Sequence, residues 1–197
     1  PILQKPLVRS THITAVTVGK GRINHRHFVG KGANRAQTQL LSQGHIRSAN
    51  QVLWVEEGIV GDDTDGHIDD TIRFVNEDTV LTVVESNTQD ENYSILQDNL
   101  AQLKKMRLLN GKQLNIVELP MPDAVIFEDQ RLPASYANFY ISNKYVIVPT
   151  FRSAMDDKAL SIISEAYKNR EVVGIDSTDI IWGLGSFHCL SQQEPLV

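Results

Sequence analysis

The sequence predicts an α/β protein built from repeated units of two β-strands, a helix and a third strand. Short runs rich in Val, Ile and Thr, bounded by polar turn residues, indicate the strands. Two longer runs with apolar residues at every third or fourth position indicate the helices. The same order of elements recurs after roughly 65 residues, which is typical of an internal structural repeat.

The first unit begins with the ranges 68–75 and 79–85, which have the composition of a β-hairpin. The range 92–109 is expected to be helical and to end at the following Asn-Gly pair, and 114–119 is expected to be a strand that Pro120 ends. The apolar stripe of this helix comprises Ile95, Leu96, Leu100, Leu103 and Met106.

The second unit repeats this pattern. The ranges 135–141 and 145–148 are expected to form a hairpin, followed by a helix over 156–169 and a strand over 171–175. The segment 120–133, which contains three prolines and shows no periodicity, is expected to be a loop that connects the two units.

Length and composition bound the class of protein. A chain of 197 residues with 41% hydrophobic content can bury one sizeable core, so we expect a single soluble unit. No apolar stretch of about 18 residues suits a bilayer span and no signal pattern opens the chain, so we expect a cytoplasmic location and no membrane partner. The single cysteine cannot form an internal disulfide, which fits a reducing compartment.

The net charge of −5 conceals an asymmetry, because residues 1–50 contain eight basic residues and no acidic ones. We therefore divide the chain into a basic segment of uncertain fold, 1–50, and a domain, 51–197. Only Phe28 in the segment could stack on a base, so we do not expect a nucleic-acid partner. A solvated or subunit-facing segment and a stretch from outside the native reading frame remain alternatives. Within the segment, 11–18 alternates like a strand.

Cys189 is the candidate nucleophile. It follows a turn containing Gly183 and Gly185, which permit a backbone path that can present a thiol at a cavity. A lone cysteine in such a protein is more often a small buried apolar residue, and that alternative stays open on these residues alone.

His67 and Asp69 are the candidate proton-transfer group and cation ligand. On a strand they would project from the same face, and Gly66 before them would let the backbone bend. A carboxylate suits the planar N–H groups of a guanidinium, and an imidazole can move protons near neutral pH. An ordinary strand histidine remains the alternative. By the same strand geometry His188 should point away from Cys189, so we expect His188 to be structural.

Three runs together resemble the agmatine deiminase and bacterial, Porphyromonas-type, peptidylarginine deiminase family, over roughly residues 51–197. The runs are Gly66-His67-Ile68-Asp69, then Ala134-Ser135-Tyr136-Ala137-Asn138-Phe139-Tyr140, and finally His188-Cys189-Leu190-Ser191-Gln192-Gln193-Glu194-Pro195 after its glycine-rich turn. The resemblance implies a pentein-type α/β propeller of ββαβ modules, of which this chain would hold the C-terminal part, two repeats and a strand that carries the cysteine. We expect so short a ring to expose module faces and to self-associate as a homo-oligomer.

The resemblance also implies a hydrolase that deiminates a small guanidino substrate, without a cofactor or a metal. Cys189 would be the nucleophile, His67 the general acid and base, and Asp69 the guanidinium ligand, with Gly66, Gly185 and Asn138 as pocket scaffold. The expected reaction converts agmatine to N-carbamoylputrescine and ammonia through a covalent thiouronium, a step of putrescine and polyamine biosynthesis. Peptidylarginine or free arginine is the alternative substrate.

Two departures from the family pattern support a second interpretation. The acidic runs of the earlier modules that complete the guanidinium cage do not occur here, and Asp70 stands where an asparagine is expected. A truncated, catalytically inactive fragment or an interaction module is therefore the alternative to an active deiminase. A zinc site lacks spaced Cys and His pairs, and a thiol protease lacks matching sequence around Cys189.

Overall fold

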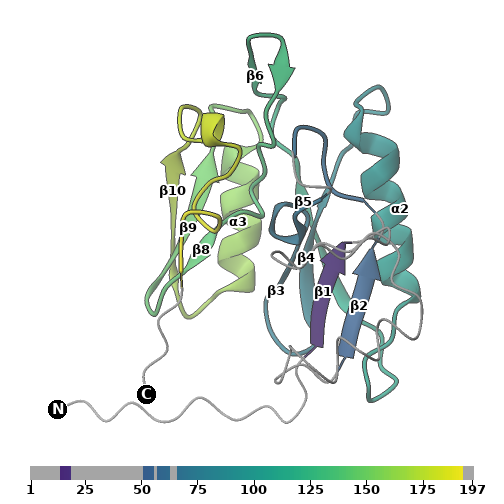
Figure 1. Ribbon diagram of the computed structural model, residues 1–197. Helices are drawn as coiled ribbons and strands as arrows, with labels where there is room; N and C mark the ends of the chain where they lie inside the picture. The colour runs from purple at the N-terminus through teal and green to yellow at the C-terminus, as the bar shows by residue number, and fades with distance from the viewer. Residues whose placement is uncertain (1–13, 19–50, 56, 63–65, 193–197) are drawn as a thin grey trace, which may run out of the picture.

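The structure is a computed structural model that describes residues 14–18, 51–55, 57–62 and 66–192 (Figure 1). The described chain contains two ββαβ units, each a three-stranded sheet with one helix. Within these residues, no helix combines the length and the apolar character needed to cross a bilayer.

The first unit comprises β3 (Ile72–Phe74), β4 (Thr79–Val84), α2 (Asn92–Lys105) and β5 (Asn115–Pro120). β4 lies in the centre of its sheet, antiparallel to β3 and parallel to β5. The crossover through α2 is what allows β4 and β5 to run in the same direction.

The second unit comprises β8 (Tyr140–Ile141), β9 (Tyr145–Thr150), α3 (Asp156–Ala166) and β10 (Glu171–Asp176). β9 is its central strand, antiparallel to β8 and parallel to β10. The pairing pattern is therefore the same as in the first unit, which confirms the predicted internal repeat.

A separate pair of strands lies beside the first unit (Figure 1). β1 (Thr14–Val18) pairs in parallel with β2 (Gln51–Val55). β1 falls inside the range 11–18 that alternates like a strand; residues 11–13 lie outside the described residues.

The main hydrophobic core joins the two units. It includes Leu81 and Leu119 from the first sheet together with Val146 and Ile163 from the second unit, all fully buried. A smaller core under α2 contains Val55 and is formed by the first unit and β2. Figure 1 shows α3 between the two sheets, where its buried face packs in the core that the two units share.

Several predicted boundaries are wrong. Residues 68–70 form a 3₁₀ turn rather than a strand, and only β8 remains of the strand predicted over 135–141. α2 ends at Lys105, and the predicted loop 120–133 contains a small hairpin of β6 (Ile126–Phe127) and β7 (Gln130–Arg131). At 68–70 and 135–139, polar side chains hold the backbone in turns where strands were predicted.

Candidate active site

The cysteine loop is shaped by a short helix and a left-handed residue. The 3₁₀ helix η2 (Ile181–Gly183) ends at Leu184, whose φ of 61° lies in the left-handed region. Gly185 then passes directly beneath the thiol, because a Cβ at Gly185 would lie 2.7 Å from the Cβ and 3.0 Å from the Sγ of Cys189. Cys189 lies in a turn and not in the predicted strand.

Asn138 is the hub that holds this loop. Its Oδ1 accepts the backbone N–H groups of Ser186 at 3.3 Å, His188 at 3.0 Å and Cys189 at 3.2 Å. Asn138 is only 1% exposed, so these contacts are made away from solvent. The predicted scaffold role of Asn138 therefore has a geometric basis, since one side chain holds the backbone that leads up to the thiol.

The amide nitrogen of Asn138 faces the other way. Its Nδ2 lies 2.9 Å from Asp69 Oδ2, 2.7 Å from Asp70 Oδ1 and 3.1 Å from Cys189 Sγ. An amide carries two hydrogens, so the three acceptors share them. The arrangement brings two carboxyl groups and the thiol around one donor.

Asp69 Oδ2 is the point at which the polar contacts converge. Besides the hydrogen bond from Asn138, it accepts one from the Cys189 thiol, with Sγ at 3.2 Å, and it lies 2.7 Å from the Nδ1 of His188. Burial alone would raise the pKa of Asp69, but the hydrogen bonds from His188 and Cys189 and the charge of His188 outweigh it and hold that pKa well below its ordinary value. Asp69 is therefore an anion, as a guanidinium ligand must be.

His188 is a site residue that sequence reasoning missed. The expectation that it points away from the thiol is wrong, because the strand geometry on which it rested does not exist: residues 187–190 form a turn. In a turn, neighbouring side chains can face the same way, and His188 and Cys189 both contact Asp69. The two glycines before the cysteine were the available signal for a turn.

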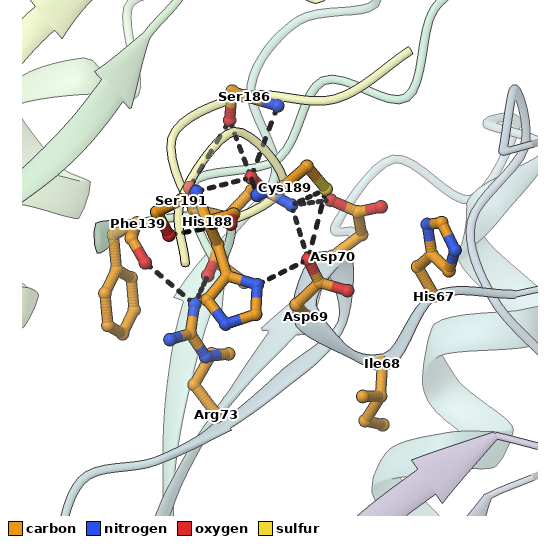
Figure 2. A network of polar contacts seen from close by, with 12 residues as sticks. His67, Ile68, Asp69, Asp70, Arg73, Phe139, Ser186, His188, Cys189 and Ser191 are labelled. Atoms are coloured by element: carbon orange, nitrogen blue, oxygen red, sulfur yellow. Dashed lines mark hydrogen bonds and ion pairs between the residues drawn. The ribbon is translucent and has the colours of Figure 1, made fainter. Parts of the chain in front are cut away.

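His67 precedes the 3₁₀ turn η1 (Ile68–Asp70) instead of lying on a strand. The predicted convergence nevertheless holds, since donor atoms of His67, Asp69 and Cys189 all lie within 4.8 Å of one another. Figure 2 shows the two histidines on opposite sides of the Asp69 and Asp70 pair. Gly66 has a φ of 111°, which supplies the backbone bend expected of it.

Asp62 orients His67. Its carboxylate accepts the backbone N–H of His67, and its Oδ1 lies 3.9 Å from the imidazole Nδ1. The Asp62 side chain is 3% exposed, whereas that of His67 is 31% exposed. The carboxylate is thus buried behind the ring and leaves the ring accessible.

Asp70 is a buried carboxyl group of a different kind. Burial and the adjacent charge of Asp69 raise its pKa well above the ordinary value. Its Oδ1 contacts Asn138, whereas its Oδ2 is buried without a hydrogen-bond partner in the described structure. Two adjacent carboxyl groups therefore differ in state, with Asp69 ionised and Asp70 favouring the proton.

The environment also acts on the thiol. Burial of the sulfur, with the charges of Asp69 and Asp70, outweighs the hydrogen bond from Asn138 and raises the pKa of Cys189 to about 12. Cys189 is exposed as a residue, although its sulfur faces the carboxylates. A negative pocket of this kind favours a cation, and the arrival of a cation would in turn favour the thiolate.

Two triads in the described residues have donor types that bind metals. One is His67, Asp69 and Cys189, and the other is Asp62, His67 and Asp70, each with donor atoms within 4.8 Å of one another. Both contain His67, so metal binding at either would take His67 away from proton transfer.

Comparison with known proteins relates this arrangement to one family. A sequence model of the Porphyromonas-type peptidyl-arginine deiminase family matches residues 33–195, beginning upstream of the expected start at 51. The agmatine deiminase of Pseudomonas fluorescens is 29% identical, over 92% of this chain and 54% of the relative.

Solved structures agree with this relationship. The C. jejuni agmatine deiminase has a TM-score of 0.73 at 32% identity, covering 88% of this chain and 49% of its own. The Enterococcus faecalis agmatine deiminase has a TM-score of 0.81 at 25% identity, covering 93% of this chain and 54% of its own. The chain thus spans about half the length of these relatives. It belongs to the Porphyromonas-type peptidyl-arginine deiminase family, and its ββαβ units are modules of the pentein-type fold.

Proposed function

We propose that the protein hydrolyses a guanidino group through Cys189, with His67 as general acid and base and Asp69 as guanidinium ligand. The observation that carries the proposal is the convergence of these three side chains, with the Cys189 sulfur 3.2 Å from an ionised carboxylate. A carboxylate beside a thiol disfavours the thiolate until a cation binds next to both groups. A guanidinium is such a cation, and its central carbon is the electrophile that a thiolate attacks.

The chemistry then follows in balanced steps. His67 accepts the thiol proton, and the Cys189 sulfur bonds to the guanidinium carbon. The C–N bond breaks as His67 returns a proton to the departing nitrogen, which leaves as ammonia. Water then adds to the carbon of the resulting thiouronium as His67 takes one of its protons. The C–S bond breaks as His67 passes that proton to the sulfur, and the second proton of the water is released as the ureido C=O bond forms, with the thiol restored.

Asp69 alone offers incomplete orientation of the substrate. A planar guanidinium is best held by carboxylates on more than one side, and misplacement by about 1 Å can cost roughly a hundredfold in rate. The acidic runs expected of the earlier modules do not occur in this sequence. We therefore assign the remaining carboxylates to a part of the protein outside this chain or to a partner copy.

Agmatine is the proposed substrate, because the relatives reported above are named agmatine deiminases and one solved C. jejuni structure holds a bound substrate. Peptidylarginine is the second candidate, since it gives the family its name. Each carries the same guanidinium head, and the two differ in what surrounds the other end of the side chain.

An inactive fragment or interaction module is the alternative from another class. It is favoured by the half-length coverage of the relatives and by the absent acidic runs. The two proposals differ in one observable, since only an assembled pocket recognises a guanidinium head.

The test measures ammonia and ureido product released by the purified chain from agmatine, a peptidylarginine and free arginine, beside a Cys189→Ser control. Turnover that the substitution abolishes supports the deiminase, and the preferred substrate decides among agmatine, peptidylarginine and free arginine. A folded chain without turnover, whose thiol reacts with chloroacetamidine no faster than a free thiol does, would instead favour the fragment.

The raised pKa of Cys189 adds a pH prediction. Labelling by neutral iodoacetamide should accelerate about tenfold for each pH unit from pH 7 to 10, because the thiolate fraction grows toward a pKa of about 12. Agmatine should flatten this dependence if it binds as a cation beside Asp69. A plateau below pH 9 without agmatine would show that the thiol is already activated in the empty site.

A further inference from the structure

Arg73 links the two ββαβ units at the site. It lies on β3 of the first unit, and its Nη1 donates hydrogen bonds to the carbonyl oxygens of Ala137 at 2.8 Å and Phe139 at 2.9 Å (Figure 2). Its guanidinium also lies 4.4 Å from the ring centroid of Phe139. Both acceptors belong to the segment that leads into β8 of the second unit.

The Ala137 carbonyl belongs to the peptide group just before Asn138, and the Phe139 carbonyl belongs to the peptide group just after Phe139. Because one guanidinium holds both, the two-residue stretch Asn138–Phe139 is fixed at its two ends and has little freedom to rotate. This constraint matters because residues 135–139 have no strand ladder to fix them. The Arg73 side chain thus replaces the hydrogen bonds that a neighbouring strand would supply.

The constraint passes through Asn138 to the thiol. The Oδ1 of Asn138 accepts the backbone N–H groups of Ser186, His188 and Cys189, and its Nδ2 contacts Asp69 Oδ2 and the Cys189 sulfur. A rotation of Asn138 would disturb both sets of contacts together.

We propose that Arg73 is a positioning residue, which clamps the two ends of the Asn138–Phe139 stretch and thereby sets the Cys189 thiol against Asp69. This inference rests on the proposed function only for its catalytic consequence, since the clamp itself is a statement about the loop. Arg73 does not touch the reacting atoms. Arginine suits the role because its rigid, delocalised guanidinium can donate to two carbonyl groups while stacking on an aromatic ring.

Arg170 provides a matched control. It also donates to a backbone carbonyl group, that of Ser142 at 3.0 Å, and its guanidinium lies 5.9 Å from the Tyr167 ring. It has no contact with the hub. Arg170→Met therefore removes the same kinds of interaction without touching the thiol loop. Arg73→Lys keeps the positive charge and an ammonium group that can donate a hydrogen bond, and it serves as the second variant in case Arg73→Met fails to fold.

The experiment compares the intact chain with Arg73→Met, Arg73→Lys and Arg170→Met by thermal melting, amide hydrogen exchange and chloroacetamidine labelling. In Arg73→Met we expect faster exchange at residues 186–189 and labelling of Cys189 slowed about a hundredfold, with about tenfold slowing in Arg73→Lys. If the chain turns over agmatine, kcat should fall with KM nearly unchanged. Arg170→Met should remain within about twofold of the parent on every site readout.

Unchanged exchange at residues 186–189 in a folded Arg73 variant would overturn the proposal. An equal effect of Arg170→Met on exchange and labelling would also overturn it, because it would show that Arg73 contributes only to the general stability of the fold. The exchange measurement does not depend on turnover. If the parent chain neither turns over agmatine nor favours chloroacetamidine, the proposed function fails while the exchange result still decides the clamp.

Discussion

At the scale of single residues, Gly185 shows how tightly the thiol is placed. Gly183 and Gly185 both precede Cys189, yet a Cβ at Gly183 would meet nothing within 4 Å, whereas one at Gly185 would overlap Cys189. The two glycines therefore have different roles. Gly185 leaves room for the sulfur, and Gly183 tolerates a side chain.

We expect Gly185→Ala to slow Cys189 labelling by chloroacetamidine about a hundredfold, because the added methyl group would displace the sulfur by about 1 Å. Gly183→Ala is the control and should stay near the parent rate, since its methyl group enters open space. Equal rates for the two variants would show that the loop adapts to the added methyl group.

Asp70 makes a contribution to the pH dependence of stability that is opposite in sign to that of Asp69. Its raised pKa means that the folded protein holds a proton that the unfolded chain releases, so the contribution of Asp70 to the free energy of unfolding should fall as pH rises above about 4. Asp70→Asn mimics the protonated form and removes this titration. We expect the variant to melt at a higher temperature than the parent at pH 7, and the difference to vanish near pH 3.

Asp98→Asn on the exposed face of α2 provides the control for the change from carboxylate to amide, and it should leave the melting temperature at pH 7 close to that of the parent. A melting difference for Asp70→Asn that is the same at pH 3 and pH 7 would show that lost packing, and not the proton, is responsible.

At the scale of secondary-structure elements, the start of α3 is tied to the segment that carries Asn138. Asp156 Oδ1 accepts the hydroxyl of Tyr136 at 2.6 Å and the backbone N–H of Phe151 at 3.1 Å, and its Oδ2 accepts that of Ser153 at 3.2 Å. One carboxylate at the positive end of the helix therefore also anchors a fully buried tyrosine two residues from the hub.

Asp156→Ala should destabilise the protein by about 1–3 kcal/mol, because it leaves the Tyr136 hydroxyl and two backbone N–H groups without their acceptor. Chemical denaturation of the variant measures this free energy. Asp157→Ala, the exposed neighbour in the same first turn, should cost less than about 0.5 kcal/mol. Equal costs for both would mean that the helix dipole, and not the anchor, dominates.

At the scale of the whole molecule, the shared core predicts that the two units unfold together. Leu81, Val146 and Ile163 come from different units but pack in one cluster, and the Tyr167 hydroxyl donates to the carbonyl oxygen of Phe74 across the units at 3.3 Å. Neither unit can lose its packing without exposing the face of the other.

The two tryptophans report on this cooperativity, since Trp54 lies on β2 beside the first unit and Trp182 on η2 after the second. In Trp182→Phe and in Trp54→Phe, the remaining tryptophan should report a transition that coincides with the loss of far-ultraviolet circular dichroism. Ile163→Ala should shift both transitions, at a cost of about 2–5 kcal/mol. Separate midpoints for the two probes would show that the units unfold independently.

The helices, the central strands and the ββαβ repeat could be predicted from the sequence because they depend on local periodicity. β4 and β9 are apolar runs between turn residues, and α2 and α3 carry apolar stripes. The hairpin of β6 and β7 escaped prediction because two-residue strands between prolines leave almost no periodic signal.

The sequence by itself determined which side chains are candidates for the proposed chemistry, since Cys189, His67, Asp69 and Asn138 stand in runs that resemble those of the deiminase family. Only the tertiary structure decided how they meet. The strand geometry assumed for His67 and His188 was wrong. A 3₁₀ turn instead positions Asp69 next to His67, and an αL residue and the Asn138 hub position His188 and Cys189. The physical reason is that these turns are fixed by hydrogen bonds between residues about 50 to 70 positions apart, such as Asn138 to Asp69 and Arg73 to Ala137, which no local pattern records.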